Sequence, residues 1–158
     1  MQGEDVERQR PTHAHELERD WMHTSIEVRT RGRGMHEVTS DVRAAVRSSG
    51  VREGLCVVFL RHTSASLVVQ ENADPSARRD LERFFDRLAP DGDPVYEHDA
   101  EGPDDMPAHI RAAVTRTSET FIVTGGDLLL GTWQGVFLFE HRHAPHRRRL
   151  DLRVIAEA

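Results

Sequence analysis

The longest unbroken apolar segment of the chain covers only six residues, 55–60. A helix that crosses a bilayer needs about 20 apolar residues, so the sequence predicts no membrane span and no membrane partner. The segment is short and rich in β-branched side chains, which favours a strand buried inside a sheet. With 158 residues the chain is long enough for one domain with a sizeable core and too short for two.

Several other segments show the two-residue alternation of strands. Strands are predicted at residues 25–30, 66–69, 95–98, 120–124, 128–130, 132–140 and 149–155. Gly125 and Gly126 separate two of these segments, and a Gly-Gly pair is a strong signal for a hairpin turn.

Three segments carry helix signals. Val42, Ala45 and Val46 follow helical spacing, and Gly50 is expected to end that helix. A second helix is predicted to start with Asp74 as its cap and Pro75 as its first residue, because apolar side chains recur at positions 81, 84, 85 and 88. A third helix is predicted to start at Pro107, which would place His109 in its first turn.

These elements predict an α+β fold with a compact, mostly antiparallel, barrel-like sheet and two or three helices, because strands outnumber helices and short turns join several of them. Residues 1–20 lack apolar periodicity and are predicted to be a disordered or loosely attached extension of a single domain at 21–158. They also lack the apolar core of a secretory signal, so we expect a cytoplasmic protein.

Composition narrows the classes of partner. The net charge of −6 gives no support to a nucleic-acid partner. The single cysteine, Cys56, excludes an intramolecular disulfide and is interpreted as a small buried apolar residue. Ten histidines are many for this length, and histidine is the commonest metal ligand.

Polar residues gather immediately after the predicted strands. His62, Thr63 and Ser64 lie between two apolar segments, either as a metal or phosphate site or as groups that satisfy the ends of strands. Glu71 and Asn72 precede Asp74 and are free to serve a site, whereas Asp74 is expected to cap its helix.

A further polar group contains His98, Asp104, Asp105 and His109. A neutral imidazole near two carboxylates suits acid–base chemistry or metal binding, although spacing alone slightly favours a solvated acidic loop. Residues 141–149 hold three histidines and four arginines and are interpreted as a polar hairpin loop. The arginines, Arg148 among them, can hold a phosphate group through their fork of donors.

Five motifs in this order resemble the YjbQ-like family, also called secondary thiamine-phosphate synthases. They are His-Thr-Ser-Ala-Ser-Leu at 62–67, Glu-Asn-Ala-Asp-Pro at 71–75, Asp-Asp-Met-Pro-Ala-His-Ile at 104–110, Leu-Gly-Thr-Trp-Gln-Gly at 130–135 and Glu-His-Arg at 140–142. The resemblance covers about residues 21–155 and is specific, because the spacing of all five motifs agrees.

The resemblance implies a homotrimer and a set of site residues. Its implied catalytic residues are His62, His98, His109, Glu71, Asp104 and Asp105, and the three histidines are also the implied metal ligands. The residues implied to bind substrate or phosphate are Thr63, Ser64, Asn72, Asp74, Trp133, Gln134 and Glu140. Arg148 is added to them on the chemistry of its donors, because the loop at 142–149 varies in the family.

The resemblance also implies a transferase reaction. A hydroxymethylpyrimidine diphosphate would be joined to a thiazole phosphate with release of diphosphate, as a weak or incidental activity. A divalent metal is expected, and its identity stays open between Mg²⁺, which prefers carboxylates, and Zn²⁺, which prefers histidines. The alternatives are a homotrimer that binds a metal or a small phosphorylated metabolite without dedicated synthase activity, and a metal-dependent phosphate-ester hydrolase.

Overall fold

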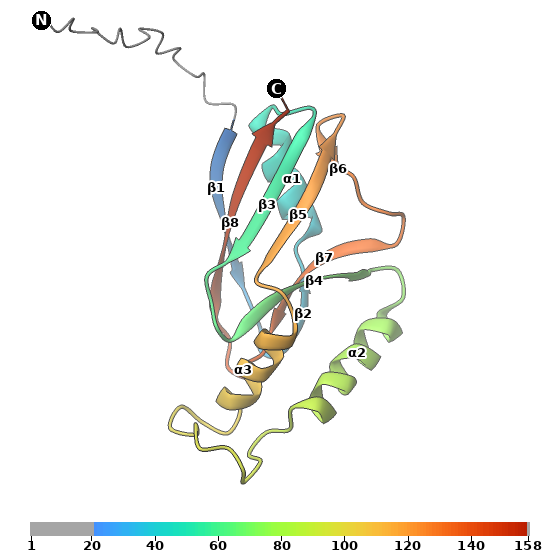
Figure 1. Ribbon diagram of the computed structural model, residues 1–158. Coiled ribbons are helices and arrows are strands. Elements are labelled where there is room, and N and C mark those ends of the chain that lie inside the picture. Colours follow the sequence, from blue (N-terminus) through green and yellow to red (C-terminus); the bar gives the residue numbers. More distant parts are fainter. Residues whose placement is uncertain (1–20, 158) are drawn as a thin grey trace, which may run out of the picture.

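The computed structural model describes residues 21–157 (Figure 1), so the predicted extension at residues 1–20 lies outside the described part. The elements follow in the order β1 (Trp21–Arg29), β2 (Gly34–Glu37), α1 (Thr39–Ser49), β3 (Gly54–Leu60), β4 (Ala65–Glu71), α2 (Pro75–Leu88), α3 (Asp105–Val114), β5 (Ser118–Thr124), β6 (Asp127–Leu128), β7 (Gln134–Glu140) and β8 (Arg147–Ala156). The named strands pair only in antiparallel ladders, which confirms the predicted α+β class.

The strands form two sheets, and several of the crossings between them lie at one end of the molecule. The first sheet has the order β1-β8-β3-β5-β6, and the second has the order β2-β7-β4. Three of the crossings, from β1 to β2, from β3 to β4 and from β7 to β8, lie near the lower end in Figure 1. Helix α3 lies at the same end, so the crossings bring polar loops close to that helix.

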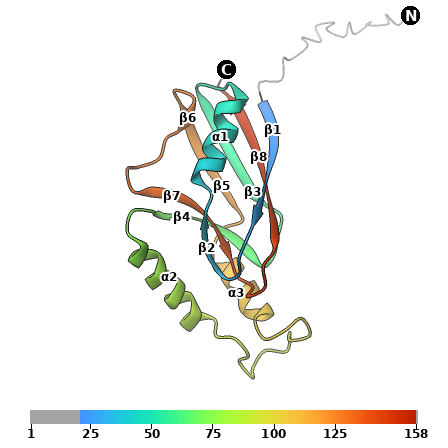
Figure 2. The same ribbon diagram turned by 180° about the vertical axis from the view of Figure 1, so that it is seen from behind.

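The main core lies between α1 and the two sheets, and Figure 2 shows α1 lying across the first sheet. Strand β7 is buried on both faces: Val136 and Leu138 belong to the main core, whereas Phe137 and Phe139 belong to a second cluster. Helix α2 covers that second cluster with Leu81 and Phe85, which are half-buried. The chain therefore places α2 on the outer face of the second sheet.

Local sequence signals set the ends of several elements as predicted. Gly50 ends α1 in the left-handed conformation with φ 74°. Gly125 and Gly126 both have positive φ and connect the paired strands β5 and β6. Asp74 caps α2 by accepting a hydrogen bond of 2.7 Å from the backbone N–H of Ser76.

Three predictions about the elements are wrong. Residues 95–98 form no strand in the described chain and belong to the loop between α2 and α3, where no neighbouring strand is available for pairing. The sequence favours a bent or hairpin-like unit for residues 55–60 and 66–69, but the corresponding strands β3 and β4 do not pair as a hairpin, because they belong to different sheets. Helix α3 begins at Asp105, two residues before Pro107, so His109 lies beyond the first turn. Proline is tolerated anywhere in that turn, since the first N–H groups have no partner within the helix.

Two further expectations concern the single cysteine and membrane spans. Cys56 is fully buried in the main core, and burial raises the pKa of its thiol to about 11. No helix within residues 21–157 has the length and apolar character needed to cross a membrane.

Candidate functional site

The structure divides the predicted site residues into three clusters. The helix-start cluster consists of His98, Asp104, Asp105 and His109; the crossing cluster of His62, Thr63, Ser64, Glu140 and Arg148; and the far cluster of Glu71, Asn72, Asp74, Trp133 and Gln134. The first two lie at the end of the molecule where the chain crosses between the sheets. The far cluster lies at the other end of β4 and β7.

The helix-start cluster brings two imidazoles to one carboxylate. His98 reaches it from the loop before α3, whereas Asp105 and His109 are one helical turn apart on α3. Asp105 Oδ2 lies 2.8 Å from His98 Nε2 and 3.9 Å from His109 Nε2. The Asp105 side chain is only 4% exposed, whereas those of His98 and His109 are 53% and 36% exposed, so the cluster opens to solvent on the histidine side.

The other side of the helix-start cluster is closed by Arg142, in the connection between β7 and β8. Its Nη1 donates to Asp105 Oδ1, and its Nε donates to Asp104 Oδ2 at 3.2 Å. Burial alone would raise the pKa of the Asp104 carboxyl, but hydrogen bonds from the His143 backbone N–H and from Arg142 outweigh it and hold that pKa below its usual value. Asp104 therefore serves as an anchor for the loop at residues 142–143.

The crossing cluster is built around a buried ion pair. Glu140 is fully buried at the end of β7, and Arg148 on β8 donates to its two oxygens from Nε and Nη2 at 2.7 and 2.6 Å. Thr30 Oγ1 donates to the same carboxylate at 3.0 Å. Burial alone would raise the pKa of Glu140, but the bonds from Arg148, from the Arg142 backbone N–H and from Thr30 outweigh it and lower that pKa. Two of the Arg148 donors are thus already engaged, which restricts its capacity for phosphate.

His62 lies beside this ion pair. Arg148 Nη1 lies 3.4 Å from its Nδ1, and the backbone N–H of Arg149 donates to its Nε2 at 3.2 Å. Burial and the charge of Arg148 lower the pKa of His62, so the ring is neutral. Ser64 accepts from Arg148 Nη2 at 3.0 Å, whereas Thr63 points into solvent in the same loop. His62 is not part of the group whose ligand atoms meet at Asp105.

The far cluster is exposed and separate from the histidines. Residues Ala65 and Glu140 pair at one end of β4 and β7, and Glu71 pairs with Gln134 at the other. Six residues of strand span about 20 Å at about 3.3 Å each, so a single chain does not bring Glu71 to His62. Trp133 is 64% exposed, and its carbonyl accepts from the Asn72 backbone N–H at 3.0 Å.

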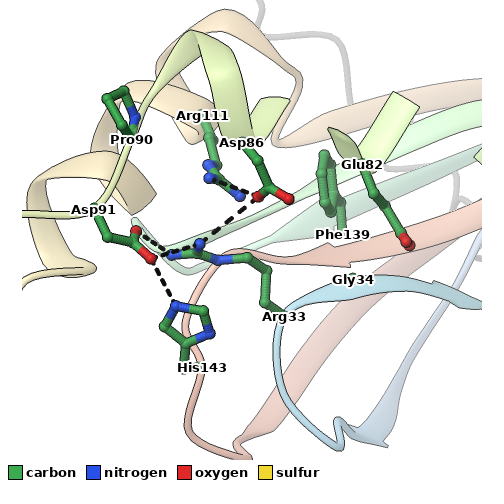
Figure 3. A pocket seen from close by; sticks show the side chains of 9 residues that line it. All are labelled: Arg33, Gly34, Glu82, Asp86, Pro90, Asp91, Arg111, Phe139 and His143. Carbon is green, nitrogen blue, oxygen red and sulfur yellow. Dashed lines mark hydrogen bonds and ion pairs between the residues drawn. The ribbon is translucent and has the colours of Figure 1, made fainter. Parts of the chain in front are cut away.

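A cleft of ≈ 470 Å³ lies elsewhere, between α2 and the loops after β1 and β7 (Figure 3). None of the predicted site residues lines it. Arg33 forks onto Asp91 at 2.7 and 2.9 Å, and Arg111 donates to Asp86 at 3.1 Å. Because its arginines already have carboxylate partners, this cleft offers little free positive charge to an anion.

Sequence reasoning misses two side chains, one fully buried and one 15% exposed. His141 was assigned to a polar loop, but it is fully buried; burial and the charge of Arg111 lower its pKa to about 3. Its Nε2 is 2.9 Å from Ser66 Oγ, and it is a neutral structural residue. The sequence marks Arg142 only as part of the Glu-His-Arg motif, and its contacts with Asp104 and Asp105 span 38 and 37 residues of sequence. No local signal reports contacts at that separation.

Comparison with known proteins places this geometry in a family. Residues 24–157 match the model of the family described as UPF0047 protein YjbQ-like. The UPF0047 protein sll1880 of Synechocystis is 53% identical over 130 residues, which are 82% of this chain and 88% of the relative. The UPF0047 protein YjbQ of Escherichia coli O157:H7 is 44% identical over 130 residues, 81% of this chain and 94% of the relative.

Solved structures agree. The crystal structure of APE1520 from Aeropyrum pernix superposes with a TM-score of 0.78 at 31% identity, covering 86% of this chain and 99% of that one. A YjbQ/UPF0047 protein from Clostridium acetobutylicum gives a TM-score of 0.74 at 34% identity, covering 85% and 99%. The chain belongs to the YjbQ-like (UPF0047) family. The family name states no reaction.

The buried Glu140–Arg148 pair generates a stability prediction. Glu140→Gln leaves the Arg148 charge buried without its counter-charge, so we expect the free energy of unfolding at pH 7 to fall by about 3–5 kcal/mol. Because the folded-state pKa of Glu140 is lowered, the ionic contribution is complete above about pH 4.5 and is lost as the pH falls through the folded-state pKa. Urea unfolding at pH 7 and at pH 3 measures both effects.

The matched control is Glu97→Gln, a substitution at an exposed position in the loop before α3. It should change stability by less than about 0.5 kcal/mol at either pH. A Glu140→Gln deficit that is equally large at pH 7 and pH 3 would contradict the assignment of the effect to the ion pair.

Proposed function

We propose that this member of the YjbQ-like family is a metal-dependent enzyme that acts on a small phosphorylated metabolite. The observation that carries the proposal is the convergence of ligand atoms from His98, Asp105 and His109, which all lie within 4.8 Å of one another. Asp105 replaces His62 in the set of metal ligands expected from the sequence, because within one chain His62 belongs to the crossing cluster.

The donor set fits a divalent ion with a preference for nitrogen. Two ligand atoms on a tetrahedral Zn²⁺, each about 2.0–2.1 Å from the ion, lie about 3.3 Å apart. The separations of 2.8 and 3.9 Å from Asp105 Oδ2 to the two imidazoles bracket this value. Two histidines and one carboxylate are typical of Zn²⁺ or Fe²⁺ sites and leave other positions open, whereas Mg²⁺ prefers oxygen ligands.

A place for the metabolite adjoins this cluster. A cleft of ≈ 380 Å³ in the loop before α3 is lined in part by His98 and by Tyr96, whose ring offers an apolar face to a heterocycle. Asp93 and Asp99 also line it, so an anionic phosphate would meet negative charge there. A divalent ion, when bound, supplies the positive charge that phosphate oxygens require.

Thiamine phosphate formation is the specific reaction that the family resemblance suggests. In it, the bond between the pyrimidine methylene carbon and the diphosphate oxygen breaks, its electron pair leaves with the diphosphate, and the thiazole nitrogen forms the new bond to that carbon. Negative charge develops on the leaving diphosphate, so the enzyme needs positive charge at that point. We propose His98 and His109 as the residues that hold the ion there.

A phosphate-ester hydrolase is the second candidate. It is favoured by the donor set, since two histidines and one carboxylate with an open side resemble the ligands of hydrolytic zinc enzymes more than a Mg²⁺–diphosphate site. Water would then be the acceptor in place of the thiazole phosphate. The two candidates share the helix-start cluster and differ in the second substrate.

We also propose that copies of the chain associate, as the homotrimer that the resemblance implies. The outer face of the first sheet carries Leu55, Phe59, Ile122 and Ile155, which are between 37% and 55% exposed. Ile122 and Ile155 both pair with Leu55 across the ladders, so they form one continuous apolar surface. Association would also give the exposed far cluster of one copy a route to the histidines of another.

Metal binding is the first test. Tag-free protein freed of metal should bind one equivalent of Zn²⁺ per chain, and His98→Ala and His109→Ala should each weaken binding at least tenfold because each removes a ligand. His23→Ala, on β1, is the matched control and should bind as wild type does. Calorimetric titration measures all four proteins, and a wild-type chain that binds no Zn²⁺ would refute the proposed function.

Activity separates the candidate reactions. With the two thiamine precursors and a divalent ion, a dedicated synthase should reach an efficiency of about 10⁴ M⁻¹s⁻¹ or more, and His109→Ala should cut turnover at least tenfold. Turnover that His109→Ala leaves unchanged would contradict the site. Synthase activity far below that efficiency, together with metal-dependent phosphate release from phosphorylated metabolites, would favour the hydrolase.

Self-association can be tested through the apolar face. Ile122→Asp places a charge within that surface, so we expect the mass measured by light scattering to fall from that of a trimer to that of a single chain. Val95→Asp, at a 75% exposed position in the loop before α3, is the control and should leave the mass unchanged. A trimeric Ile122→Asp variant would exclude this face as the contact.

A further inference from the structure

We infer that Arg142 is a positioning residue for the helix-start cluster, a role that rests on the metal site proposed above. Arg142 contacts Asp105 through Oδ1, whereas the two imidazoles lie nearer to Oδ2. Its proposed task is to hold Asp105 so that Oδ2 alone is presented to a metal ion, and to hold the loop that carries His98.

The guanidinium of Arg142 is fixed from three directions. Nη1 donates to Asp105 Oδ1, Nε donates to Asp104 Oδ2 at 3.2 Å, and Nη2 donates to the backbone carbonyl of Glu101 at 2.7 Å. The side chain is only 15% exposed. A planar guanidinium that donates hydrogen bonds from all three nitrogens cannot rotate without breaking at least one of them, so its orientation is well defined.

This orientation determines which oxygen of Asp105 is free. Because Oδ1 accepts from Arg142, Oδ2 is the oxygen left on the side of His98 and His109. Loss of Arg142 would free the carboxylate to rotate about its last bond and would leave Asp104 and Asp105 without their shared counter-charge. Either change moves the ligand oxygen or lowers its availability, and partners of metal ligands typically contribute 10–100-fold in affinity.

Arg142 also links the separate pieces of chain that supply the ligands. Asp105 and His109 belong to α3, whereas His98 belongs to the preceding loop. The Glu101 carbonyl lies between His98 and α3 in sequence, so its bond to Arg142 fastens that loop to the same side chain that holds Asp105. One arginine in the β7–β8 connection therefore fixes the helix and the loop relative to the sheet.

The planar fork explains why arginine suits this position. A lysine ammonium can neutralise Asp104 and Asp105 but offers a single point of charge, so it cannot serve Asp105 and the Glu101 carbonyl in the same geometry. Arg142→Lys should therefore restore part of the metal affinity that Arg142→Gln removes. A purely structural role in the fold would not predict this graded recovery of binding.

The test uses Co²⁺ alone as the probe, since its visible absorption reports on coordination geometry. Tag-free, metal-free wild type, Arg142→Gln, Arg142→Lys and Arg116→Gln are titrated by calorimetry and by absorption, and far-UV circular dichroism checks the fold of each protein. Arg116 pairs with Glu119 at an exposed position and serves as the matched control. We expect Arg142→Gln to bind at least tenfold more weakly with an altered spectrum, Arg142→Lys to lie between it and wild type, and Arg116→Gln to match wild type.

Each outcome decides a separate point. A folded Arg142→Gln variant with wild-type Co²⁺ affinity and spectrum would overturn the role of Arg142 while the metal site stands. If Arg142→Gln does not fold, Arg142→Lys decides, because affinity and spectrum equal to wild type would overturn the role equally. A wild-type chain that binds no Co²⁺ would remove the metal site and the inference together.

Discussion

The buried pair of Glu140 and Arg148 is the interaction on which the site end of the molecule depends. It joins the last residue of β7 in one sheet to β8 in the other, and Thr30 at the end of β1 adds a third bond. Compared with apolar residues of similar size, such a pair contributes little net stability. An arrangement of β7 and β8 that separated the two residues would, however, leave a charge buried alone at a cost of about 3–5 kcal/mol. Because the crossing is fixed at Glu140, the residues that follow it are directed toward α3.

Much of the fold follows from local signals in the sequence. The apolar segment of β3, the Gly125-Gly126 turn and the Asp74-Pro75 helix start each have a physical cause within a few residues, and the structure confirms all three. Predictions fail where the structure of a segment depends on a partner that is distant in the sequence. Residues 95–98 have strand-like alternation but meet no strand to pair with. Strand β7 is buried on both faces because α2 returns to cover it, which alternation along β7 alone does not reveal.

The candidate site shows the same division. Asp105 and His109 have i, i+4 spacing and share a helix face once the helix begins at Asp105, so a start at Asp105 rather than Pro107 would have paired them from sequence alone. His98 joins them through the fold of a loop, and Arg142 through the register of β7 and the crossing that follows. His62 suits a set of metal ligands by residue type. Its position beside Arg148, where the chain crosses between the sheets, is visible only in the three-dimensional structure.

Charge explains why the helix-start cluster needs an arginine from the β7–β8 connection and still favours a cation. Asp104 and Asp105 are neighbours and both are buried, so two negative charges must be accommodated in a small volume. Arg142 spans both with Nε and Nη1 and cancels one of the two charges. The remaining charge of about −1 lies near Asp105 Oδ2, the oxygen that faces His98 and His109. On a single chain this arrangement attracts a cation and repels phosphate, so a phosphorylated ligand is expected there only together with a divalent ion.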